Sequence, residues 1–214
     1  MKKADIRQFY ERLRAANPHP TTELHYESPF QLLVAVILSA QATDVGVNKA
    51  TARLFPVAPT PAAMAALGEA GLAEYIRTIC LYRTKAKNVV ATCRLLLERH
   101  GGEVPADRAS LEALPGVGRK TANVVLNTAF NIPSGIIVDT HVARVSRRLG
   151  LTDSENADTI EQELMPLVPE ARWTQFGPAM VLLGRYTCTA RAVKCTECVM
   201  NDVCEKRHLP EEKT

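Results

Sequence analysis

Four cysteines near the carboxyl end form the most specific chemical pattern in the chain. They follow the spacing C-x6-C-x2-C-x5-C, at Cys188, Cys195, Cys198 and Cys204. A single C-x2-C pair is a weak signal, but four thiols in one short stretch are typical of a four-thiolate metal site. Structural zinc usually joins two close pairs and this stretch has only one, so the spacing favours an iron–sulfur cluster over zinc. Two disulfides are a minor alternative.

The cellular compartment decides whether those thiols are expected to bind metal or to form disulfides. The amino terminus carries repeated charges without an apolar core of the kind found in export signals, and no uncharged apolar run is long enough to span a membrane. We therefore expect a cytoplasmic protein, in which clustered cysteines bind metal rather than pair as disulfides. Cys80 and Cys93 have no other cysteine close by in the sequence, and isolated cysteines most often pack as small core side chains.

A glycine-rich stretch, Leu114–Thr121, reads LPGVGRKT and separates two helical patterns. Gly116 and Gly118 permit a tight turn and bring backbone N–H groups to the start of the second helix, where they can bind phosphate. Arg119 interrupts the Gly-Lys-Thr of a P-loop, and no third glycine completes a dinucleotide fingerprint. The pattern resembles a helix-hairpin-helix at about residues 108–127, which holds a DNA phosphate without reading bases. An ordinary helix–helix turn is the alternative.

Lys120 follows this turn and is the candidate nucleophile. Helical spacing places it on one face with Asn123 and Asn127, opposite the apolar face of the same helix. The helix macrodipole disfavours a cation at this end, and a neutral lysine amine is suited to Schiff-base chemistry. A solvated surface lysine is the alternative.

Asp139 is the candidate partner carboxylate. It follows the apolar run Ile136–Val138 and precedes a predicted helix, where it is suited to act as an N-cap. An anion fixed in this way could also stabilise an oxocarbenium-like sugar cation and accept a proton. A lysine and an aspartate alone remain weak support for catalysis.

The net charge is only +3, from 26 Lys and Arg against 23 Asp and Glu, yet the charges are segregated along the chain. No acid occurs between Glu74 and Glu98, in 113–138 or in 171–196, and arginines cluster at 144–148. Such segregation suits a face that neutralises phosphates. On charge alone, basic side chains that merely face solvent are an equally good explanation.

Helical patterns predominate among the elements that must position these residues. They are expected at 29–40, 44–54, 61–67, 72–79, 85–100 and 108–114, and again after the hairpin and after Asp139. The one strand-like run, Ile136–Val138, is too short for a sheet. In 214 residues these helices predict an all-α fold with one core or two small lobes, Pro133–Gly135 as a hinge and 152–158 as a surface connection.

Further short motifs agree with these sites and occur in a recognisable order: LSAQATD at 38–44, LPGVGRKT at 114–121, VDTH at 138–141 and GRYTC at 184–188. With the cysteine spacing, they cover almost the full length. On these residues the chain resembles the endonuclease III family, DNA glycosylases and abasic-site lyases of the helix-hairpin-helix superfamily.

The resemblance implies a two-lobed helix-hairpin-helix glycosylase fold. Residues 23–132 would form a six-helix barrel domain carrying the hairpin. Residues 1–22 and 133–214 would form a discontinuous helical domain with a [4Fe–4S] cluster in the loop 188–204, held by the four cysteines. It further implies a monomer that binds duplex DNA containing damaged bases or abasic sites.

The chemistry implied by the resemblance is removal of an oxidised pyrimidine from a nucleotide extruded from the duplex. Lys120 would attack C1′ and form a Schiff base, Asp139 would stabilise the sugar cation and move protons, and β-elimination would cleave the strand. Gln41 and Leu81 look like the residues that fill the gap left by the extruded nucleotide. The DNA-contacting set is completed by Gly116, Gly118, Arg119, Arg144, Arg191 and Lys194.

Several positions depart from the family pattern. The segment Asn131–Val138 is one residue longer than expected, Leu183 stands where a histidine is expected, and Ala192-Val193 replaces a more basic pair in the cysteine loop.

Two other functions remain open. One is a thymine-mismatch glycosylase of the same superfamily, and the other is a non-enzymatic DNA-binding protein with a metal-filled cysteine loop.

Overall fold

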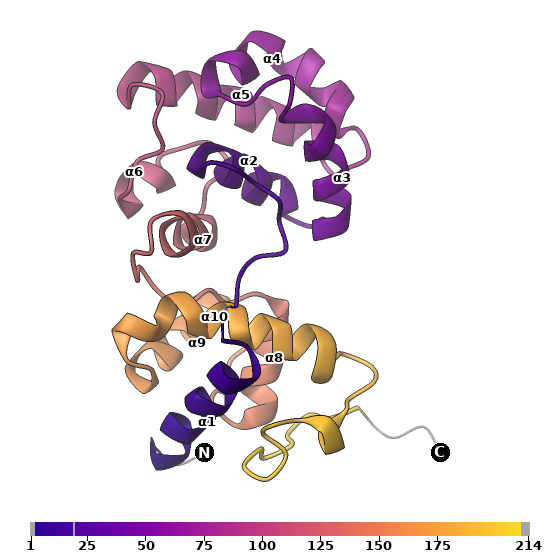
Figure 1. Cartoon of the computed structure of the whole chain (residues 1–214), viewed down its shortest axis with the longest axis vertical. Coiled ribbons are helices and arrows are strands. Elements are labelled where there is room, and N and C mark those ends of the chain that lie inside the picture. Colours follow the sequence, from indigo (N-terminus) through magenta and orange to yellow (C-terminus); the bar gives the residue numbers. More distant parts are fainter. Residues whose placement is uncertain (1–2, 19, 211–214) are drawn as a thin grey trace. The chain divides into compact units, whose positions relative to one another are not determined.

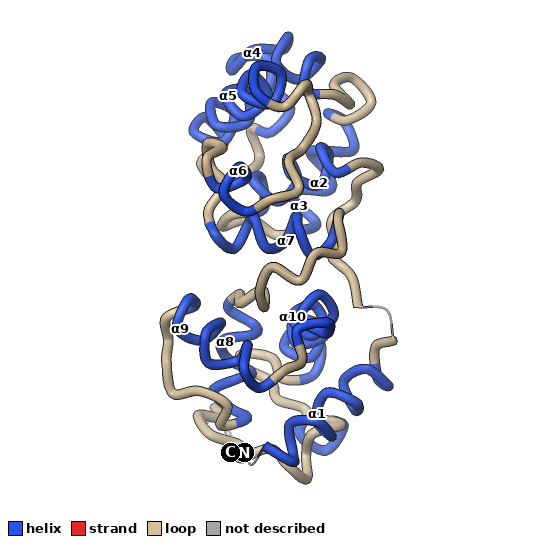
Figure 2. Tube along the Cα trace, turned by 90° about the vertical axis from the view of Figure 1, so that its left-hand side faces the viewer, coloured by secondary structure: helices blue, strands red, loops and turns tan. Residues whose placement is uncertain are grey.

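The computed structural model describes residues 3–18 and 20–210. Every regular element in this part of the chain is helical, which confirms the all-α fold (Figure 2). Contacts divide it into two compact units: Glu23–Asn131, and the described residues of Met1–Thr22 with Ile132–Thr214. Among the described helices, none combines the length and the apolar character that crossing a membrane requires.

The Glu23–Asn131 unit is built around one buried helix, α2 (Pro29–Ser39). Its sequence is apolar on every side, and all residues from Phe30 to Leu38 are buried. It packs against α3, α5 and α7, and α5 packs extensively along α4 (Figure 1). The other helices of the unit are α3 (Asp44–Leu54), α4 (Pro61–Ile76), α5 (Tyr82–Arg99), α6 (Arg108–Glu112) and α7 (Arg119–Ala129).

Side-chain caps explain where most of these helices begin. Each capping oxygen accepts a hydrogen bond from a backbone N–H in the first turn, which would otherwise lack a partner. The caps of α2, α3, α4 and α6 are Ser28, Thr43, Thr60 and Asp107. Hydrogen bonding to the backbone and side chain of Ser110 lowers the pKa of Asp107, which favours the charged cap.

The helices predicted at 61–67 and 72–79 form one kinked element, α4, which ends at Ile76 rather than at residue 79. Gly68 marks the kink, because its φ of 65° is left-handed and lies outside the helical range. Glycine adopts this backbone without the steric cost that a side chain brings. Periodicity therefore detected both halves of α4 but not their continuity.

The second unit contains α1 (Lys3–Ala16), α8 (Thr140–Leu149), α9 (Ala157–Leu164) and α10 (Trp173–Leu182). α1 packs on α10, and Phe9 and Phe176 meet edge to face with ring centroids 5.8 Å apart. Tyr10 donates a hydrogen bond to Gln175 across the same contact. These contacts join the two chain segments of the unit.

One expectation in this unit needs correction, and another is confirmed. The stretch 152–158 was expected to be a surface connection throughout, but α9 begins within it at Ala157, capped by Asn156. The run Ile136–Val138 is buried and pairs in no sheet among the described residues; instead Ile137 packs against Gly177 of α10, where an added Cβ would meet its backbone at 3.2 Å.

The two isolated cysteines behave differently. Cys93 is fully buried in α5, as expected of a core thiol, and burial raises its pKa to about 12. Such a thiol is unreactive at neutral pH. Cys80 is exposed, so the expectation that it packs in the core is wrong.

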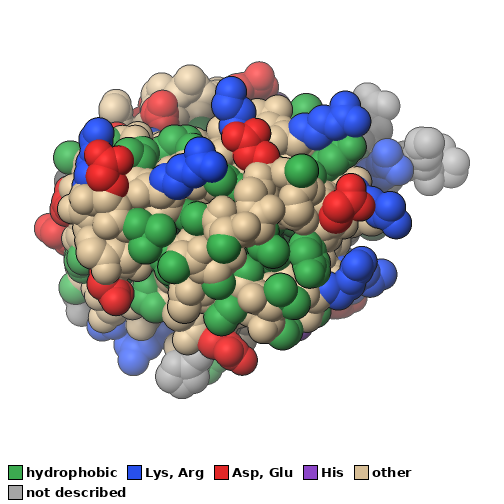
Figure 3. Space-filling model, turned by 90° about the horizontal axis from the view of Figure 1, so that it is seen from above, with side chains coloured by type: hydrophobic (Ala, Val, Ile, Leu, Met, Phe, Trp, Pro, Cys, Tyr) green, Lys and Arg blue, Asp and Glu red, His purple; other side chains and the backbone are tan. Residues whose placement is uncertain are grey.

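One face of the molecule can be judged for charge directly. Figure 3 looks down on the end that carries α4, and there Lys and Arg side chains are interspersed with Asp and Glu. Mixed charges cancel at short range, so this face offers no basic patch for a polyanion.

Candidate functional site

The hairpin at Leu114–Val117 is a tight turn closed by a hydrogen bond from Val117 N to Leu114 O at 3.1 Å. Gly116 has a φ of 79°, and a proline precedes it, which together make a type II turn. A Cβ at Gly116 would lie 2.9 Å from the Asn88 side chain, whereas a Cβ at Gly118 would meet nothing. Of the two predicted glycines, only Gly116 needs the left-handed conformation.

α7 begins directly after this turn without a side-chain cap, because its N-cap is Gly118. A helix start of this kind presents backbone N–H groups and the positive end of the macrodipole to an anion. Arg119 and Lys120 are both exposed in the first turn of α7. The structure thus brings the predicted phosphate-binding glycines and the predicted nucleophile onto one short segment.

The polar, solvent-facing side of α7 that carries Lys120 is narrower than the sequence periodicity predicted. Asn123 and Asn127 were expected beside it on the polar side of the helix, but both are buried. The reason is that α7 packs on α2, so the buried stripe of α7 is wider than its apolar residues alone indicate. Lys120 itself remains exposed, as predicted.

Gln41 and Leu81 share an unusual backbone. Gln41 has a φ of 54° and Leu81 a φ of 57°, both in the left-handed region that side chains disfavour. Both are exposed, and Leu81 is one of the more exposed large apolar side chains among the described residues, at 57%. Gln41 lies just beyond the end of α2, and Leu81 occupies the N-cap position of α5.

Asp139 caps α8, as its position in the sequence predicted. Its Oδ1 accepts hydrogen bonds from the backbone N–H groups of His141 and Val142, both at 2.8 Å. Both bonds fall on one oxygen, and the side chain remains partly exposed. The carboxylate is therefore held in a fixed orientation with its second oxygen directed away from the cap.

The four clustered cysteines line one small pocket together with Arg148 and Val193. Three donors contact sulfur: Arg148 Nη1 lies 3.3 Å from Cys188 Sγ, and the backbone nitrogens of Met200 and Lys206 lie 3.4 and 3.3 Å from the Sγ atoms of Cys198 and Cys204. Burial raises the pKa of the Cys198 and Cys204 thiols, and these N–H groups oppose that effect.

Comparison with known proteins adds family evidence to this geometry. Residues 34–170 match the HhH-GPD superfamily of base excision DNA repair proteins. Endonuclease III of Escherichia coli strain K12 is 57% identical over 96% of this chain and 97% of its own length. Endonuclease III of Haemophilus influenzae is 53% identical over 99% of this chain and its own full length. The chain belongs to the endonuclease III family.

Solved structures agree with this assignment. A trapped covalent intermediate of endonuclease III with DNA superposes with a TM-score of 0.90 at 42% identity, covering 96% of this chain and 97% of that one. A non-covalent endonuclease III–DNA complex gives the same score at 43% identity. A thermostable thymine-DNA glycosylase, at 23% identity, shares the fold. As a member of the endonuclease III family, the chain is a base-excision DNA glycosylase and abasic-site lyase.

The cysteine pocket of this endonuclease III family member can be tested for the kind of metal it suits. Within the described residues, no three His, Cys, Asp or Glu side chains converge as ligands of a single ion. Zinc needs its ligands about 2.3 Å from one point. In a [4Fe–4S] cluster each cysteine binds a different iron, so the sulfurs stand further apart around a shared pocket. The donor set, four cysteine thiols lining one pocket, suits a thiolate-bound metal centre.

The predicted DNA-contacting cations of the second unit have different surroundings. Arg144 is partly buried, and its guanidinium donates to Gly184 O at 2.6 Å and to Cys188 O at 3.1 Å. Arg191 and Lys194 are exposed on the cysteine loop, and Lys194 lies 3.9 Å from Glu197. The geometry therefore favours an internal role for Arg144, while Arg191 and Lys194 keep a surface position.

Two of the departures from the family pattern also have a place in the structure. Leu183 is buried in the core of its unit, so an apolar side chain suits the position. Val193 lines the cysteine pocket and pairs its backbone with Cys188. Both side chains serve packing in this family member.

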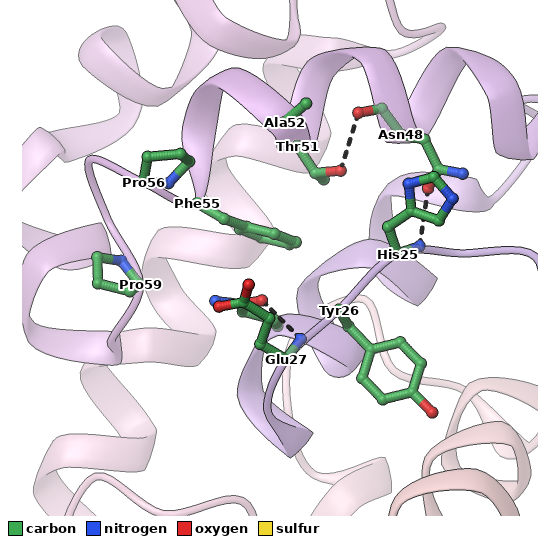
Figure 4. Close-up of a pocket in the computed structure, with 10 residues that line it drawn as sticks. His25, Tyr26, Glu27, Asn48, Thr51, Ala52, Phe55, Pro56 and Pro59 are labelled. Atoms are coloured by element: carbon green, nitrogen blue, oxygen red, sulfur yellow. Dashed lines mark hydrogen bonds between the residues drawn. The ribbon is translucent and has the colours of Figure 1, made fainter.

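Another pocket, of about 470 Å³, lies between the segment 25–31 and α3 (Figure 4). No residue predicted for the site lines it. Two of its polar contacts are internal: His25 N donates to Asn48, and Glu27 N donates to the buried Gln31. Figure 4 shows these groups bonded to one another rather than directed at a shared point.

Lys85 is the residue that sequence reasoning missed. The sequence placed it only among the basic residues of an acid-poor stretch, yet its side chain is buried and hydrogen-bonded to two backbone carbonyls near Gln41. Helical position gave one usable signal, because Lys85 lies on the apolar face of α5 with Ala86 and Val89.

Proposed function

We propose that this chain removes oxidised or saturated pyrimidines from duplex DNA and then cleaves the strand at the resulting abasic site. The observation that carries the proposal is the segment 114–120, where a phosphate-binding turn leads directly into an exposed lysine. Support comes from the solved relative trapped covalently on DNA, since a covalent intermediate needs an enzyme nucleophile.

In this proposal Lys120 Nζ forms a bond to C1′ of the extruded nucleotide as the glycosidic bond breaks, and the damaged base leaves with a proton. Opening of the sugar ring gives a Schiff base between Lys120 and C1′. Loss of a proton from C2′ then expels the 3′ phosphate by β-elimination. The position of Lys120 in the exposed first turn of α7, directly after the phosphate-binding turn, supports this role.

Asp139 is proposed to stabilise the positive charge that develops on the sugar and to carry protons during ring opening. Its fixed orientation at the start of α8 supports this role, because a carboxylate that is already oriented needs no reorganisation during the reaction. Its free oxygen is the atom suited to accept the proton.

Gln41 and Leu81 are proposed to occupy the gap that the extruded nucleotide leaves in the duplex. An amide can hydrogen-bond the unpaired opposite base, and an exposed leucine can replace lost stacking. Backbone N–H groups near Gly116 and Gly118, with Arg119, would hold a phosphate. Arg191 and Lys194 would add phosphate contacts on the cysteine loop, with Arg144 bracing that loop from within.

Cys188, Cys195, Cys198 and Cys204 are proposed to hold a [4Fe–4S] cluster. When bound, the cluster would replace core packing in a loop that has little regular structure. Residues 23–132 would then be the barrel domain, with 1–22 and 133–214 as the cluster domain. We propose a monomer that works in the bacterial cytoplasm at the nucleoid, in keeping with its bacterial relatives.

Borohydride trapping tests the proposal. The wild-type chain, incubated with duplex DNA containing thymine glycol and reduced, should give a covalent adduct visible on a denaturing gel. Lys120→Ala should abolish the adduct and slow strand cleavage at least about a thousandfold, because the nucleophile is gone. Lys49→Ala, at an exposed lysine on α3, is the matched control and should trap normally.

Two outcomes would reject the scheme: an adduct that survives in Lys120→Ala, or no adduct with the wild type. A thymine-mismatch glycosylase is the alternative substrate class, since that fold is shared. It would be favoured by faster turnover of a G·T mismatch than of thymine glycol under the same conditions.

A further inference from the structure

The turn that carries Gln41 is held in a conformation that its sequence does not favour. Ala42 N donates to Ser39 O at 2.9 Å, Ala40 has φ −55° and ψ 117°, and Gln41 has a φ of 54°. These values define a type II turn, whose third residue is normally glycine or asparagine. In the related type I turn the third residue has a negative φ that suits glutamine.

The two turn types differ in the orientation of one peptide group. Turning over the peptide between the second and third residues converts type I into type II. In this turn that peptide carries the carbonyl of Ala40. Whatever binds Ala40 O in its present direction therefore also fixes the backbone of Gln41 and the direction of its side chain.

Lys85 supplies that contact. Its Nζ donates to Ala40 O at 2.6 Å and to Leu38 O at 2.8 Å, and the side chain is only 5% exposed. Both carbonyls lie at the carboxyl end of α2, where the macrodipole favours a cation. Burial lowers the pKa of Lys85, a cost that an apolar side chain of similar length would avoid.

The backbone of the same residue contacts the second left-handed position. Lys85 N donates to Leu81 O at 3.0 Å and closes the first turn of α5. Leu81 occupies the N-cap of that helix without a side-chain cap. One residue thus connects the Gln41 turn, through its side chain, with the Leu81 turn, through its main chain.

We infer that Lys85 is a positioning residue whose side chain holds the Gln41 turn, beside the helix that begins after Leu81, in the orientation needed to fill the gap in the duplex. The inference rests on the gap-filling role proposed above for these two residues. Lys85 is buried, so it would act through the Gln41 turn rather than by touching DNA. A purely structural lysine would stabilise the fold but would have no selective effect on nucleotide extrusion.

Single-turnover cleavage of two thymine glycol substrates separates a positioning role of Lys85 from a purely structural one. One substrate is fully paired, and the other carries the lesion in a small bubble, where the nucleotide is already unstacked. Lys85→Met should slow cleavage of the paired substrate about tenfold and leave the bubble substrate within about twofold of wild type. Lys87→Met, at an exposed lysine of the same helix, should change neither rate.

A second comparison uses Gln41→Ala. If Lys85 acts largely through Gln41, adding Lys85→Met to Gln41→Ala should slow paired-substrate cleavage by no more than about threefold further. Equal slowing of both substrates by Lys85→Met, or fully multiplicative effects in the double variant, would overturn the inference. If Lys85→Met fails to fold, Lys85→Gln carries the same comparisons.

The outcomes also separate this inference from the proposed function. A wild-type chain that cleaves neither substrate would reject the glycosylase and lyase scheme. Normal cleavage of the paired substrate by Gln41→Ala would reject the gap-filling role and the Lys85 inference with it, while the Schiff-base scheme would stand.

Discussion

Two turns in the Glu23–Asn131 unit share one geometry but carry different residues at the left-handed position. The turn Leu114–Val117 has Gly116 at its left-handed position, and the turn Ser39–Ala42 has Gln41 there. Glycine adopts a positive φ freely, whereas a residue with a side chain pays about 1–2 kcal/mol. The residue at the left-handed position therefore makes the Leu114–Val117 turn relaxed and the Ser39–Ala42 turn strained.

The same helix supports both turns at the equivalent atom. Thr92 Oγ1 of α5 donates to Pro115 O at 3.0 Å, and Lys85 Nζ donates to Ala40 O at 2.6 Å. Both carbonyls belong to the second residue of a type II turn, and the two donors lie two helical turns apart on α5. A hydroxyl suffices for the glycine turn, while the strained turn receives a charged donor, which makes a stronger hydrogen bond.

The difference matches what each turn must present. A turn that lets a phosphate approach its backbone is best without a side chain, and Gly116 meets that need. A turn that presents a side chain to the duplex cannot use glycine, so it must be held by other parts of the fold. Three substitutions test this contrast.

The largest effect is expected from Gly116→Ala. Its Cβ would combine a positive φ with an approach of 2.9 Å to Asn88, so stability to urea should fall by about 2 kcal/mol. DNA affinity should fall with it. Gly118→Ala is the control, since its Cβ meets nothing and its φ is −97°. Equal losses in the two variants would show that the turn geometry does not matter.

Thr92→Val should have an intermediate effect. It removes the donor to Pro115 O while keeping the shape of the side chain, so unfolding free energy should fall by about 1 kcal/mol. Thr84→Val, at an exposed site on the same helix, should be close to neutral. A stability for Thr92→Val equal to wild type would mean that α5 does not brace the hairpin.

Gln41→Gly should have the smallest effect on stability, and in the opposite direction. Relief of about 1–2 kcal/mol of strain is partly offset by about 0.5–1 kcal/mol of backbone entropy, so urea unfolding should show a net gain of about 0.5 kcal/mol. The same variant should cleave paired thymine glycol substrate more slowly. A loss of stability would contradict the assignment of strain to this turn.

Local patterns in the sequence were enough to predict the hairpin, the Asp139 cap and the cysteine loop, because each depends on neighbouring residues. The burial of Asn123 could not be predicted in this way, since it depends on how α7 packs on α2. The buried position of Lys85 could not be predicted for the same reason. Its partner Ala40 lies 45 residues earlier, and no periodicity links a lysine to a distant carbonyl.

The α4 kink and α10 show two further limits. A left-handed glycine inside α4 interrupts the helical backbone without ending the element, so the sequence suggested two helices. α10 is apolar on most sides and contains Pro178, which hides the periodicity that marks an amphipathic helix.

The pairing of α1 with α10 has a consequence for synthesis on the ribosome. Glu23–Asn131 is contiguous and can fold once α7 has emerged. α1, which buries Phe9 and Leu13 in the finished protein, packs on α10, and that helix is complete only when Leu182 is made. From Ala16 to Leu182 the ribosome adds 166 residues, so at ordinary translation rates of about 5–20 residues per second this wait lasts roughly 8–33 s. During that interval the apolar face of the first helix is open to chaperones, and the nascent chain is most exposed to misassembly.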